Sequence, residues 1–396
     1  MTPAVFHVAG DLSARAAVRS LRSSQIREVA NTGIGREGVL PFWFGEPDEP
    51  TPREVREVAA ASLDAGNTFY VQTLGMPSLR AAIAGYVSAL HKPIGVDRIA
   101  VTNSGTTALM TAIQTVIGPG DRVVTLTPQW PNLVEMPKVV GATVETVPLD
   151  FSVEEGWHLD IDKLLKQLTP GTAALMLNSP NNPTGWTVSR EQQQRILDRC
   201  RQHGIWIIAD DVYERFYFEG NAAPSFLDIA DEDDKVISAN SFSKGWLMTG
   251  WRAGWLVAPK PLIPQIGKLI EFSAGCTPAF VQEAAQFALE NGEATIARTL
   301  SRFKTARDYL HDKLATIPGV HLGTPAPGAM YTFFKVDGIT DSFEFCTSLL
   351  EKTGLGLAPG TAFGPEGQGY LRWCFASDLD RIDDGVDRLR TYLMAR

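Results

Sequence analysis

Seven short apolar runs within residues 98–258 constrain the fold of this chain more than any other feature. Longer segments with helical spacing lie between several of them, such as Ser189 to His203, where Ser189 is placed to cap a helix and Gln192 follows three residues later. Buried strands that alternate with helices predict an α/β fold, in which a mostly parallel seven-stranded sheet carries helices on both faces. The runs are residues 98–102, 122–127, 142–147, 173–178, 205–210, 235–240 and 253–258.

The pattern changes after about residue 290. A long helical segment over about 293–316 leads to short strand-like runs near 330–336 and 370–375, and a last helix begins near residue 378. This order is typical of a smaller α+β domain. The chain has 396 residues, enough for two or three domains at roughly 100–200 residues each. We expect a large domain over 46–290 and a discontinuous small domain made of 1–45 with 291–396.

The first part of the chain shows two further helical signals. Residues 11–30 have helical spacing of their apolar positions. The segment Thr51-Pro52-Arg53-Glu54 predicts the start of another helix, with the Thr51 hydroxyl as its cap and Pro52 at its first position. The first twelve residues contain no basic segment followed by an apolar run, so we expect no secretion signal.

Charge and cysteine content exclude several classes of protein. Lys and Arg number 36 and Asp and Glu number 45, and the net charge of −9 disfavours general binding to nucleic acid or to anionic membranes. The longest charge-free stretch, residues 99–120, contains too many polar residues to span a membrane. No metal site is predicted, and we expect a cytoplasmic protein whose cysteines are free thiols. These are Cys200, Cys276, Cys346 and Cys374.

Two motifs point to chemistries that their context contradicts. Residues 33–38 fit G-x-G-x-x-G, but a helical segment precedes them and a strand-like run follows, the reverse of a dinucleotide site. Residues 241–244 read S-x-x-K and residues 352–354 read K-T-G, as in acyl-serine enzymes. The K-T-G here closes a helical run instead of lying on a strand, and the S-x-N triplet precedes the S-x-x-K. We interpret both motifs as coincidental.

Polar residues follow the predicted strands at the points where open α/β sheets bind ligands. Residues 103–107 (NSGTT) precede a helix and suit a phosphate, residues 178–185 (NSPNNPTG) form a stiff loop, and Asp210 ends a buried strand. Lys244 and Arg252 follow a later strand. A phosphate site, a buried carboxylate for a protonated ring nitrogen, amide and phenol donors for a ring oxygen and a lysine amine for an aldehyde together predict pyridoxal 5'-phosphate as the cofactor.

The same residues carry a family resemblance. Residues 243–254 fit the pattern S-K-x5-G-x-R-x-G, and the loop NSPNNPTG precedes it in the right order. Over nearly its whole length, from GEPDEPTP to LRWCFA, the chain resembles the class I and II aminotransferases among the fold-type I pyridoxal-phosphate enzymes. The resemblance implies that the large domain binds the cofactor. It also implies a ping-pong reaction that moves the amino group of an α-amino acid to a 2-oxo acid.

The resemblance assigns roles residue by residue. It implies that Lys244 bonds the cofactor and moves the α-proton, that Asp210 pairs with the ring nitrogen, and that Tyr213 with Asn182 contacts the ring oxygen. Trp130 is expected to stack on the ring. Arg372 is expected to bind the substrate α-carboxylate, with help from Gly45 and Asn182. The residues expected to hold the phosphate are Ser104, Gly105, Thr106, Ser241 and Arg252, with Ser243 as a further contributor and Tyr70 acting from a neighbouring subunit.

Partners and substrate remain broader expectations. A Tyr70 that serves the neighbouring site implies a homodimer with shared active sites. No motif names a cation for a second substrate carboxylate, although Arg27 and Arg36 lie in a region that often covers this pocket. The candidates for the side-chain pocket are Trp43, Phe44, Trp130, Met330, Tyr331 and Phe334.

The same cofactor scaffold supports other reactions. A carbon–sulfur β-lyase and a ring-forming synthase share the motifs described above, so the sequence separates them poorly from an aminotransferase. Release of ammonia and a 2-oxo acid without an oxo-acid acceptor would mark a lyase. A non-catalytic regulator on this fold is disfavoured, because the segment before GEPDEPTP has only about 40 residues and carries no basic helix-turn-helix.

Overall fold

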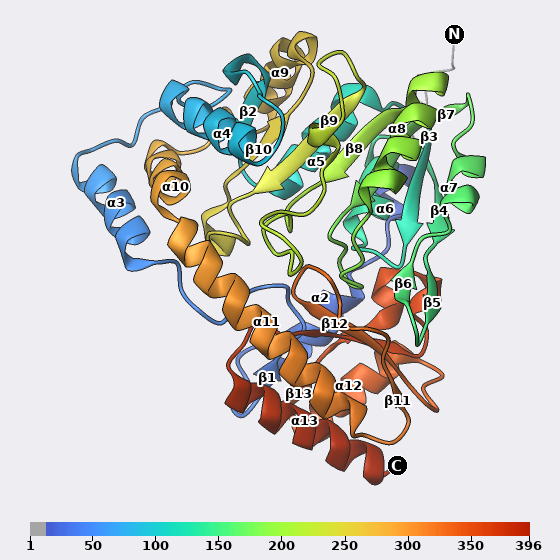
Figure 1. The fold of residues 1–396 in the computed structure, drawn as a ribbon. Helices are drawn as coiled ribbons and strands as arrows, with labels where there is room; N and C mark the ends of the chain where they lie inside the picture. The colour runs from blue at the N-terminus through green and yellow to red at the C-terminus, as the bar shows by residue number, and fades with distance from the viewer. Residues whose placement is uncertain (1–12) are drawn as a thin grey trace.

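The structure is a computed structural model that describes residues 13–396, and its largest element is a seven-stranded sheet in the upper half of Figure 1. Its strands are β2 (Ile99–Thr102), β3 (Arg122–Thr127), β4 (Thr143–Pro148), β7 (Thr172–Asn178), β8 (Trp206–Asp210), β9 (Val236–Ser241) and β10 (Gly254–Val257). They lie in the order β2-β10-β9-β8-β7-β3-β4, and β10 alone is antiparallel to its neighbours. Each predicted run forms one strand, so the predicted mostly parallel sheet is confirmed.

Helices cover both faces of this sheet, as predicted. They are α3 (Arg53–Asp64), α4 (Pro77–Leu90), α5 (Gly105–Val116), α6 (Asn132–Val139), α7 (Ile161–Gln167), α8 (Arg190–His203), α9 (Ile263–Ser273) and α10 (Ala279–Asn291). Alternate strand residues face opposite sides, so Ile208 packs with α5, α6 and α9 while Ile207 packs with α7 and α8. Helices α3, α4 and α10 cover the β2–β10 edge on the side of α7 and α8. The Ser189 and Gln192 capping box of α8 is present as predicted.

A smaller α+β region forms the lower half of Figure 1. Helix α11 (Glu293–Ala315) runs down into it from the large region. The predicted long helix, the two strand runs and the last helix are therefore confirmed. The other elements are β11 (Val320–His321), β12 (Tyr331–Val336), α12 (Ser342–Thr353), β13 (Leu355–Gly356), β14 (Ala358–Pro359), β15 (Tyr370–Cys374) and α13 (Leu379–Met394), and the sheet order is β11-β12-β15-β14.

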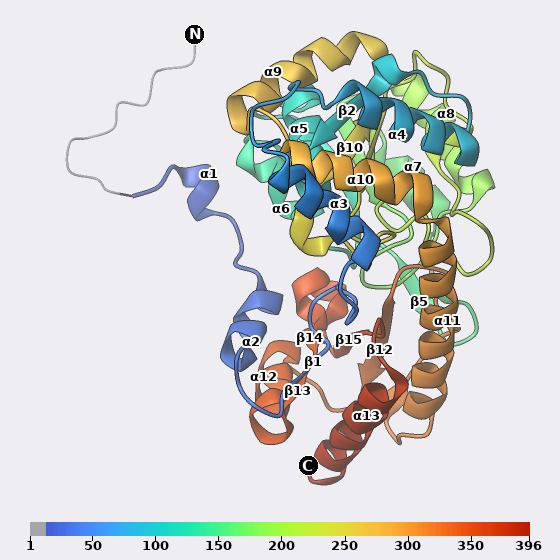
Figure 2. The same ribbon diagram turned by 90° about the vertical axis from the view of Figure 1, so that its left-hand side faces the viewer.

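The N-terminal segment contacts both regions: residues 25–41 pack onto the smaller region (Figure 2), whereas Arg15 donates to Val139 O at 2.8 Å in the large region. The predicted single helix over 11–30 is two helices, α1 (Ala16–Arg19) and α2 (Gln25–Gly33), followed by β1 (Leu40–Pro41), which pairs with β13. Ile26 and Val29 of α2 are buried in the core of the smaller region. These contacts fit the discontinuous small domain, whose boundaries stay a prediction. Residues 1–12, to which the absence of a secretion signal was tied, lie outside the described residues.

The predicted cap of α3 is wrong. Helix α3 begins at Arg53 with Pro52 at the cap position, and no side chain caps it. The Thr51 hydroxyl instead donates to Leu247 O at 2.6 Å and accepts from Trp251 Nε1 at 2.8 Å. Tertiary hydrogen bonds replace the predicted cap, because Thr51 is buried against the segment that follows Lys244.

The two discounted motifs, the cysteines and the apolar stretches can also be located in the structure. Residues 33–38 connect α2 to β1, and Lys352 and Thr353 end α12, so neither discounted motif has the context its chemistry needs. All four cysteines are free. Within residues 13–396 no helix is both long and apolar enough to cross a membrane. The same residues contain no group of three or more His, Cys, Asp or Glu side chains that could hold a metal ion.

Candidate active site

A cavity of about 880 Å³ lies where the carboxyl ends of the parallel strands meet the smaller region. The loops after β2, β7, β8 and β9 form one side of it, while residues 43–46, Tyr331 and Arg372 form the other. Among the predicted site residues Tyr70 alone lies outside the lining. The predicted residues that line it are Gly45, Ser104, Gly105, Thr106, Trp130, Asn182, Asp210, Tyr213, Ser241, Lys244, Arg252 and Arg372.

One end of the cavity is the first turn of α5. Ser104 is the N-cap residue, and its hydroxyl accepts from Thr107 N–H at 3.1 Å. Its φ of +128° is rare for a residue with a side chain and turns the chain sharply into the helix. The first N–H groups of a helix have no partner inside the helix, so those of Gly105 and Thr106 are available to an anion.

Ser241, Ser243 and Arg252 complete this end. Arg252 Nη1 lies 3.4 Å from Ser243 Oγ, and Ser241 Oγ donates to Ser243 Oγ at 2.9 Å. Strand β10 passes so close to the first turn of α5 that a Cβ on Gly254 would lie 2.6 Å from Gly105 N. Glycine at this position allows hydroxyls, backbone N–H groups and a guanidinium to surround one small space.

Asp210 ends β8 in the floor of the cavity and is buried. Its side chain accepts one hydrogen bond from the described residues, from Val212 N–H at 3.4 Å. Burial raises the pKa of Asp210 to about 7, because a carboxylate removed from water without a cationic partner is costly. The position therefore suits a carboxylate that a bound cation completes.

Lys244 points into the same space from the loop after β9. Burial lowers the pKa of its amine to about 8, and the nearby guanidinium groups of Arg372 and Arg252 contribute in the same direction. Its Nζ donates to Gly45 O. A lysine with this pKa is partly neutral near neutral pH, so it can act as a nucleophile and as a base.

The side chains of Tyr213 and Tyr331 contact each other close to Lys244. Their hydroxyl oxygens are 2.6 Å apart, and Lys244 Nζ lies 5.8 Å from the Tyr213 ring centroid. A Cβ on Gly45 would lie 1.9 Å from the Tyr331 hydroxyl, which explains glycine there. The sequence places Tyr331 among the pocket aromatics but gives no sign of its contact with Tyr213, because that contact joins the two regions of the fold.

Arg372 on β15 is a preorganised cation. It is buried, and its guanidinium donates to Trp43 O and, at 3.0 Å, to Asn182 Oδ1. Its Cζ lies 4.5 Å from the Tyr331 ring centroid, a cation–π contact. Within the described part of the chain its Nε has no hydrogen-bond partner. An arginine fixed in this way, with one N–H group that has no partner, suits a carboxylate ligand.

The remaining candidates divide clearly. Trp43, Phe44, Trp130 and Tyr331 line the cavity, whereas Met330 and Phe334, predicted for the same pocket, are fully buried in the small-region core. Those two predictions are wrong because the register of β12 turns both side chains away from the cavity. Arg27 lines the cavity and Arg36 does not.

Sequence reasoning missed several lining residues. Ser24, Glu46 and Asn132 belong to the cavity wall, although none was singled out. Glu46 adjoins Gly45 in the predicted turn and could have been found there. Ser24 and Asn132 carry no local signal, because only the packing of α2 and α6 around the sheet brings them to the cavity.

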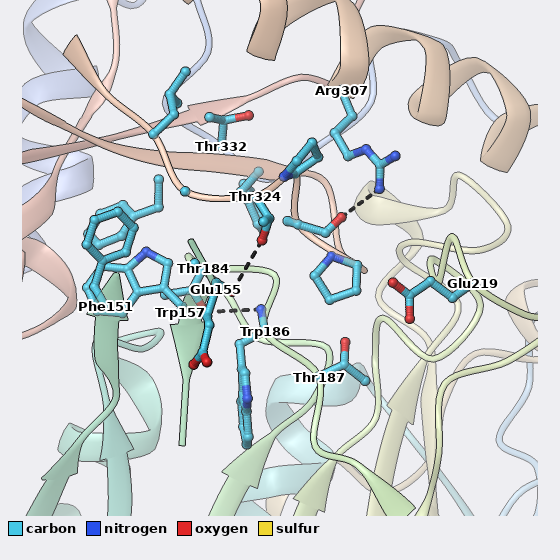
Figure 3. A pocket seen from close by; sticks show the side chains of 18 of the residues that line it. Phe151, Glu155, Trp157, Thr184, Trp186, Thr187, Glu219, Arg307, Thr324 and Thr332 are labelled. Carbon is cyan, nitrogen blue, oxygen red and sulfur yellow. Dashed lines mark hydrogen bonds between the residues drawn. The ribbon is translucent and has the colours of Figure 1, made fainter. Parts of the chain in front are cut away.

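A second cavity, of about 410 Å³, lies beside the first (Figure 3). The hairpin of β5 (Asp150–Ser152) and β6 (Gly156–His158), the segment 184–189 and the loop 322–327 enclose it, with Arg307 of α11 at one side. Its Arg307 donates to Ala326 O at 2.7 Å and pairs with Asp308, so that charge is already satisfied. Tyr331 lines both cavities, but none of the residues predicted to bind the cofactor or the α-carboxylate lines this one.

Comparison with known proteins agrees with this geometry. The family description "Aminotransferase class I and II" matches residues 37–389. An aspartate aminotransferase of Pyrococcus horikoshii is 32% identical over 377 residues, which cover 94% of this chain and 95% of that protein. An aromatic-amino-acid aminotransferase of Thermococcus litoralis is 30% identical over 377 residues, 93% of this chain and 95% of that protein. The crystal structure of an aspartate aminotransferase from Thermotoga maritima superposes with a TM-score of 0.88 at 30% identity, over 96% of this chain and 100% of that one.

Members of this family depend on pyridoxal 5'-phosphate, and the cavity fits that group. The α5 turn with Arg252 suits its phosphate, the buried and cation-deficient Asp210 suits a protonated ring nitrogen, and Lys244 suits its aldehyde. Fold and cavity thus define a pyridoxal-phosphate-dependent enzyme that transfers amino groups. The chain belongs to the class I and II aminotransferase family.

Proposed function

We propose that the chain moves an amino group from an α-amino acid to a 2-oxo acid in two half-reactions at this cavity. The observation that carries the proposal is that Lys244, Asp210 and Arg372 line one cavity, although Asp210 ends β8, Lys244 follows β9 and Arg372 lies in the middle of β15. A lysine with a lowered pKa, a buried carboxylate and a guanidinium with an unpartnered N–H group are the groups that this reaction needs. The relatives named above are aminotransferases, which supports the same activity.

The residues divide the chemical work. When bound, the cofactor supplies an aldehyde carbon for the amino group and a ring that takes up the electron pair left at the α-carbon. Lys244 Nζ would hold the aldehyde until a substrate amine replaces it, and the freed amine would be the base that takes the proton from the substrate α-carbon and donates it again. Asp210 would keep the ring nitrogen protonated. Tyr213 and Asn182 would donate to the ring oxygen, and Trp130 would pack against the ring.

Other residues orient the substrate and the cofactor. Arg372 binds the α-carboxylate, with Gly45 and Asn182 beside it, which places the α-proton within reach of Lys244. The phosphate is held by Ser104, Gly105, Thr106, Ser241 and Arg252, with Ser243 bridging the last two.

We further propose a cytoplasmic homodimer in which Tyr70 reaches the partner's phosphate site. The Tyr70 side chain is 93% exposed and its neighbour Phe69 is 82% exposed in the single chain. Phe272, at 87%, lies on α9, and the bond of 2.7 Å from Thr73 Oγ1 to Glu271 joins the two segments. Three large exposed aromatic side chains in adjoining segments support an interface. Four free cysteines support a reducing compartment.

A half-reaction without an oxo acid tests the proposed activity. The protein is loaded with pyridoxal 5'-phosphate and mixed with single amino acids, while absorbance and 2-oxo acid release are measured. The proposal expects the cofactor absorbance to move to that of pyridoxamine 5'-phosphate, with one oxo acid released per site. Lys244→Ala should show no such conversion. Continued release of oxo acid and ammonia over many turnovers would instead identify a β-lyase.

A further inference from the structure

Asp211 directly follows Asp210 at the end of β8 but lies behind the wall of the cavity. Asp210 and Tyr213 line the cavity, whereas Asp211 and Glu214 do not, although all four are buried. Successive residues at a strand end point to opposite sides, so the Asp211 side chain points away from the cavity. None of the roles described above is assigned to Asp211.

Hydroxyl groups hold the Asp211 carboxylate. Ser238 Oγ on β9 donates to Asp211 Oδ2 at 2.6 Å, and Ser225 Oγ donates to the same oxygen at 3.2 Å. The backbone N–H of Asp211 donates to Ala239 O at 2.9 Å, so backbone and side chain are both bonded to β9. Within the described part of the chain no cation lies within ion-pair distance of this carboxylate. The charge of Asp211 is therefore held in place but not neutralised.

The other charged side chains behind this loop pair with one another. His91 is a cation there, because hydrogen bonds to Asp228 and Glu214 raise its pKa to about 10 despite burial. The charge of Glu214 raises the pKa of Asp211 and that of His91 lowers it, so these two influences oppose each other. Three acids thus face three cations and leave Asp211 uncompensated. The pairs are His91 with Glu214, His91 with Asp228, Arg190 with Asp228, and Arg215 with Glu293.

Asp210 and Asp211 are therefore two successive buried carboxylates without a cationic partner. Their Cα atoms are about 3.8 Å apart, as across any trans peptide. Burial is the main cause that raises the pKa of each to about 7, and the charge of Asp211 further raises the pKa of Asp210. The charge of Lys244 also reaches Asp210, but its Nζ donates to Gly45 O and not to a carboxylate. A cation that binds Asp210 is attracted by both carboxylates, because little water screens them.

We propose that Asp211 is a positioning residue that adds a second negative charge behind Asp210 and so strengthens the binding of a cofactor whose ring nitrogen is protonated. This inference rests on the proposed function. Asp210 makes the contact with the ring nitrogen, while Ser238 and Ser225 hold the second charge at a fixed place behind it. Asp211 itself touches neither cofactor nor substrate, since it lies outside the cavity lining.

Asp211→Asn tests the inference, because it keeps the size of the side chain and an acceptor oxygen for Ser238 but removes the charge. Ser238→Ala is the matched control, since it removes the hydrogen bond of 2.6 Å and leaves the charge. Dissociation constants are measured by calorimetry on the cofactor-free proteins at pH 8, above the pKa of both carboxyl groups. The two ligands are pyridoxamine 5'-phosphate and its analogue with a C–H group in place of the ring nitrogen, which cannot be protonated there.

The inference expects Asp211→Asn to weaken the binding of pyridoxamine 5'-phosphate about 5- to 30-fold and that of the analogue less than about twofold. Ser238→Ala should change the binding of both ligands by the same factor. Equal losses for both ligands in Asp211→Asn would show a merely structural role, and unchanged binding of pyridoxamine 5'-phosphate would also overturn the inference. Asp211→Ser serves for the same comparison if Asp211→Asn does not fold. A parent protein that binds neither ligand would refute the cofactor and with it the proposed function, which is a distinct result.

Discussion

Lys244 owes its chemistry to burial. Removal of its amine from water is the largest influence and lowers the pKa to about 8; Cys374 and Glu46 oppose this shift, and Arg372 and Arg252 add to it by smaller amounts. The neutral amine is the form that attacks an aldehyde. A surface lysine, with its pKa near 10.4, would hold that form only at much higher pH.

Cofactor uptake should therefore follow the titration of Lys244. In the cofactor-free protein we expect the rate of covalent attachment of pyridoxal 5'-phosphate to rise about tenfold per pH unit below 8, because the neutral fraction rises so. Above pH 8 the rate should level off. Stopped-flow absorbance between pH 6 and 10.5 measures this profile, and a rate that still climbs to pH 10.5 would show an unperturbed lysine.

Arg372 should matter to every α-amino acid alike. Its guanidinium is held by Trp43 O and Asn182, and lysine cannot reproduce its planar fork. We expect Arg372→Lys to raise KM about 10- to 100-fold for all amino acids while cofactor binding persists. A loss confined to one class of amino acid would contradict the assignment, because the α-carboxylate is common to all of them.

At the scale of elements, the strands were easier to predict than the contacts that helix ends and strand side chains make with distant parts of the chain. The seven runs formed seven strands because each is an apolar segment of strand length bounded by polar residues. The cap of α3 failed, since Thr51 bonds Leu247 and Trp251, which lie far away in sequence. The orientation of Met330 and Phe334 also depended on the β12 register, which pairing with β15 sets.

A buried charge cluster joins α4 to the loop that carries Tyr213. His91, at the end of α4, lies 3.3 Å from Glu214 and 2.7 Å from Asp228, and its side chain is 2% exposed. Burial alone would lower its pKa, but the hydrogen bonds to Asp228 and Glu214 outweigh burial and raise the pKa to about 10. Because Glu214 follows Tyr213 directly, this group of His91, Glu214 and Asp228, called the His91 clamp below, fixes the position of the loop that carries Tyr213.

The His91 clamp should give the protein a pH-dependent stability. The His91 pKa is about 10 when folded and about 6.5 when unfolded, so its contribution is complete below pH 6.5 and is lost as pH rises toward 10. His91→Gln should lower the free energy of unfolding at pH 6.5 by about 3–5 kcal/mol, since it leaves the buried Glu214 without a charged partner and removes one of the two cationic partners of Asp228.

Urea unfolding at pH 6.5, 8 and 10 measures the difference between parent and variant. That difference should shrink as pH rises. His321→Gln serves as control, because His321 pairs with Asp337 at 2.9 Å on the surface. A His91→Gln effect that is the same at all three pH values would show that the buried histidine is not protonated.

At the scale of the whole molecule, the site exists only where two regions meet. The strand-end residues Asp210 and Lys244 were predictable, because parallel strands deliver their carboxyl ends to one edge. The contacts of Tyr331 and the position of Arg27 at the cavity were not predictable, since both depend on how the small region and α2 pack against that edge. No local pattern encodes such packing.

The shared site of the proposed dimer can be tested by mixing variants. The Lys244→Ala homodimer should be nearly inactive, and the Tyr70→Ala homodimer should be weakened. A mixed dimer contains one site with an intact Lys244 and, from the other subunit, an intact Tyr70, so its activity should exceed that of both parents. Activity no higher than that of the Tyr70→Ala parent would show that Tyr70 serves its own chain.

The attachment of the cofactor to Lys244 is the most direct test of the whole account. The loaded protein is reduced with borohydride, digested, and its peptides are weighed by mass spectrometry. We predict one modified peptide, which contains Lys244 and carries the mass of the reduced cofactor. Modification of another lysine, or none at all in a protein that has taken up pyridoxal 5'-phosphate, would contradict the account.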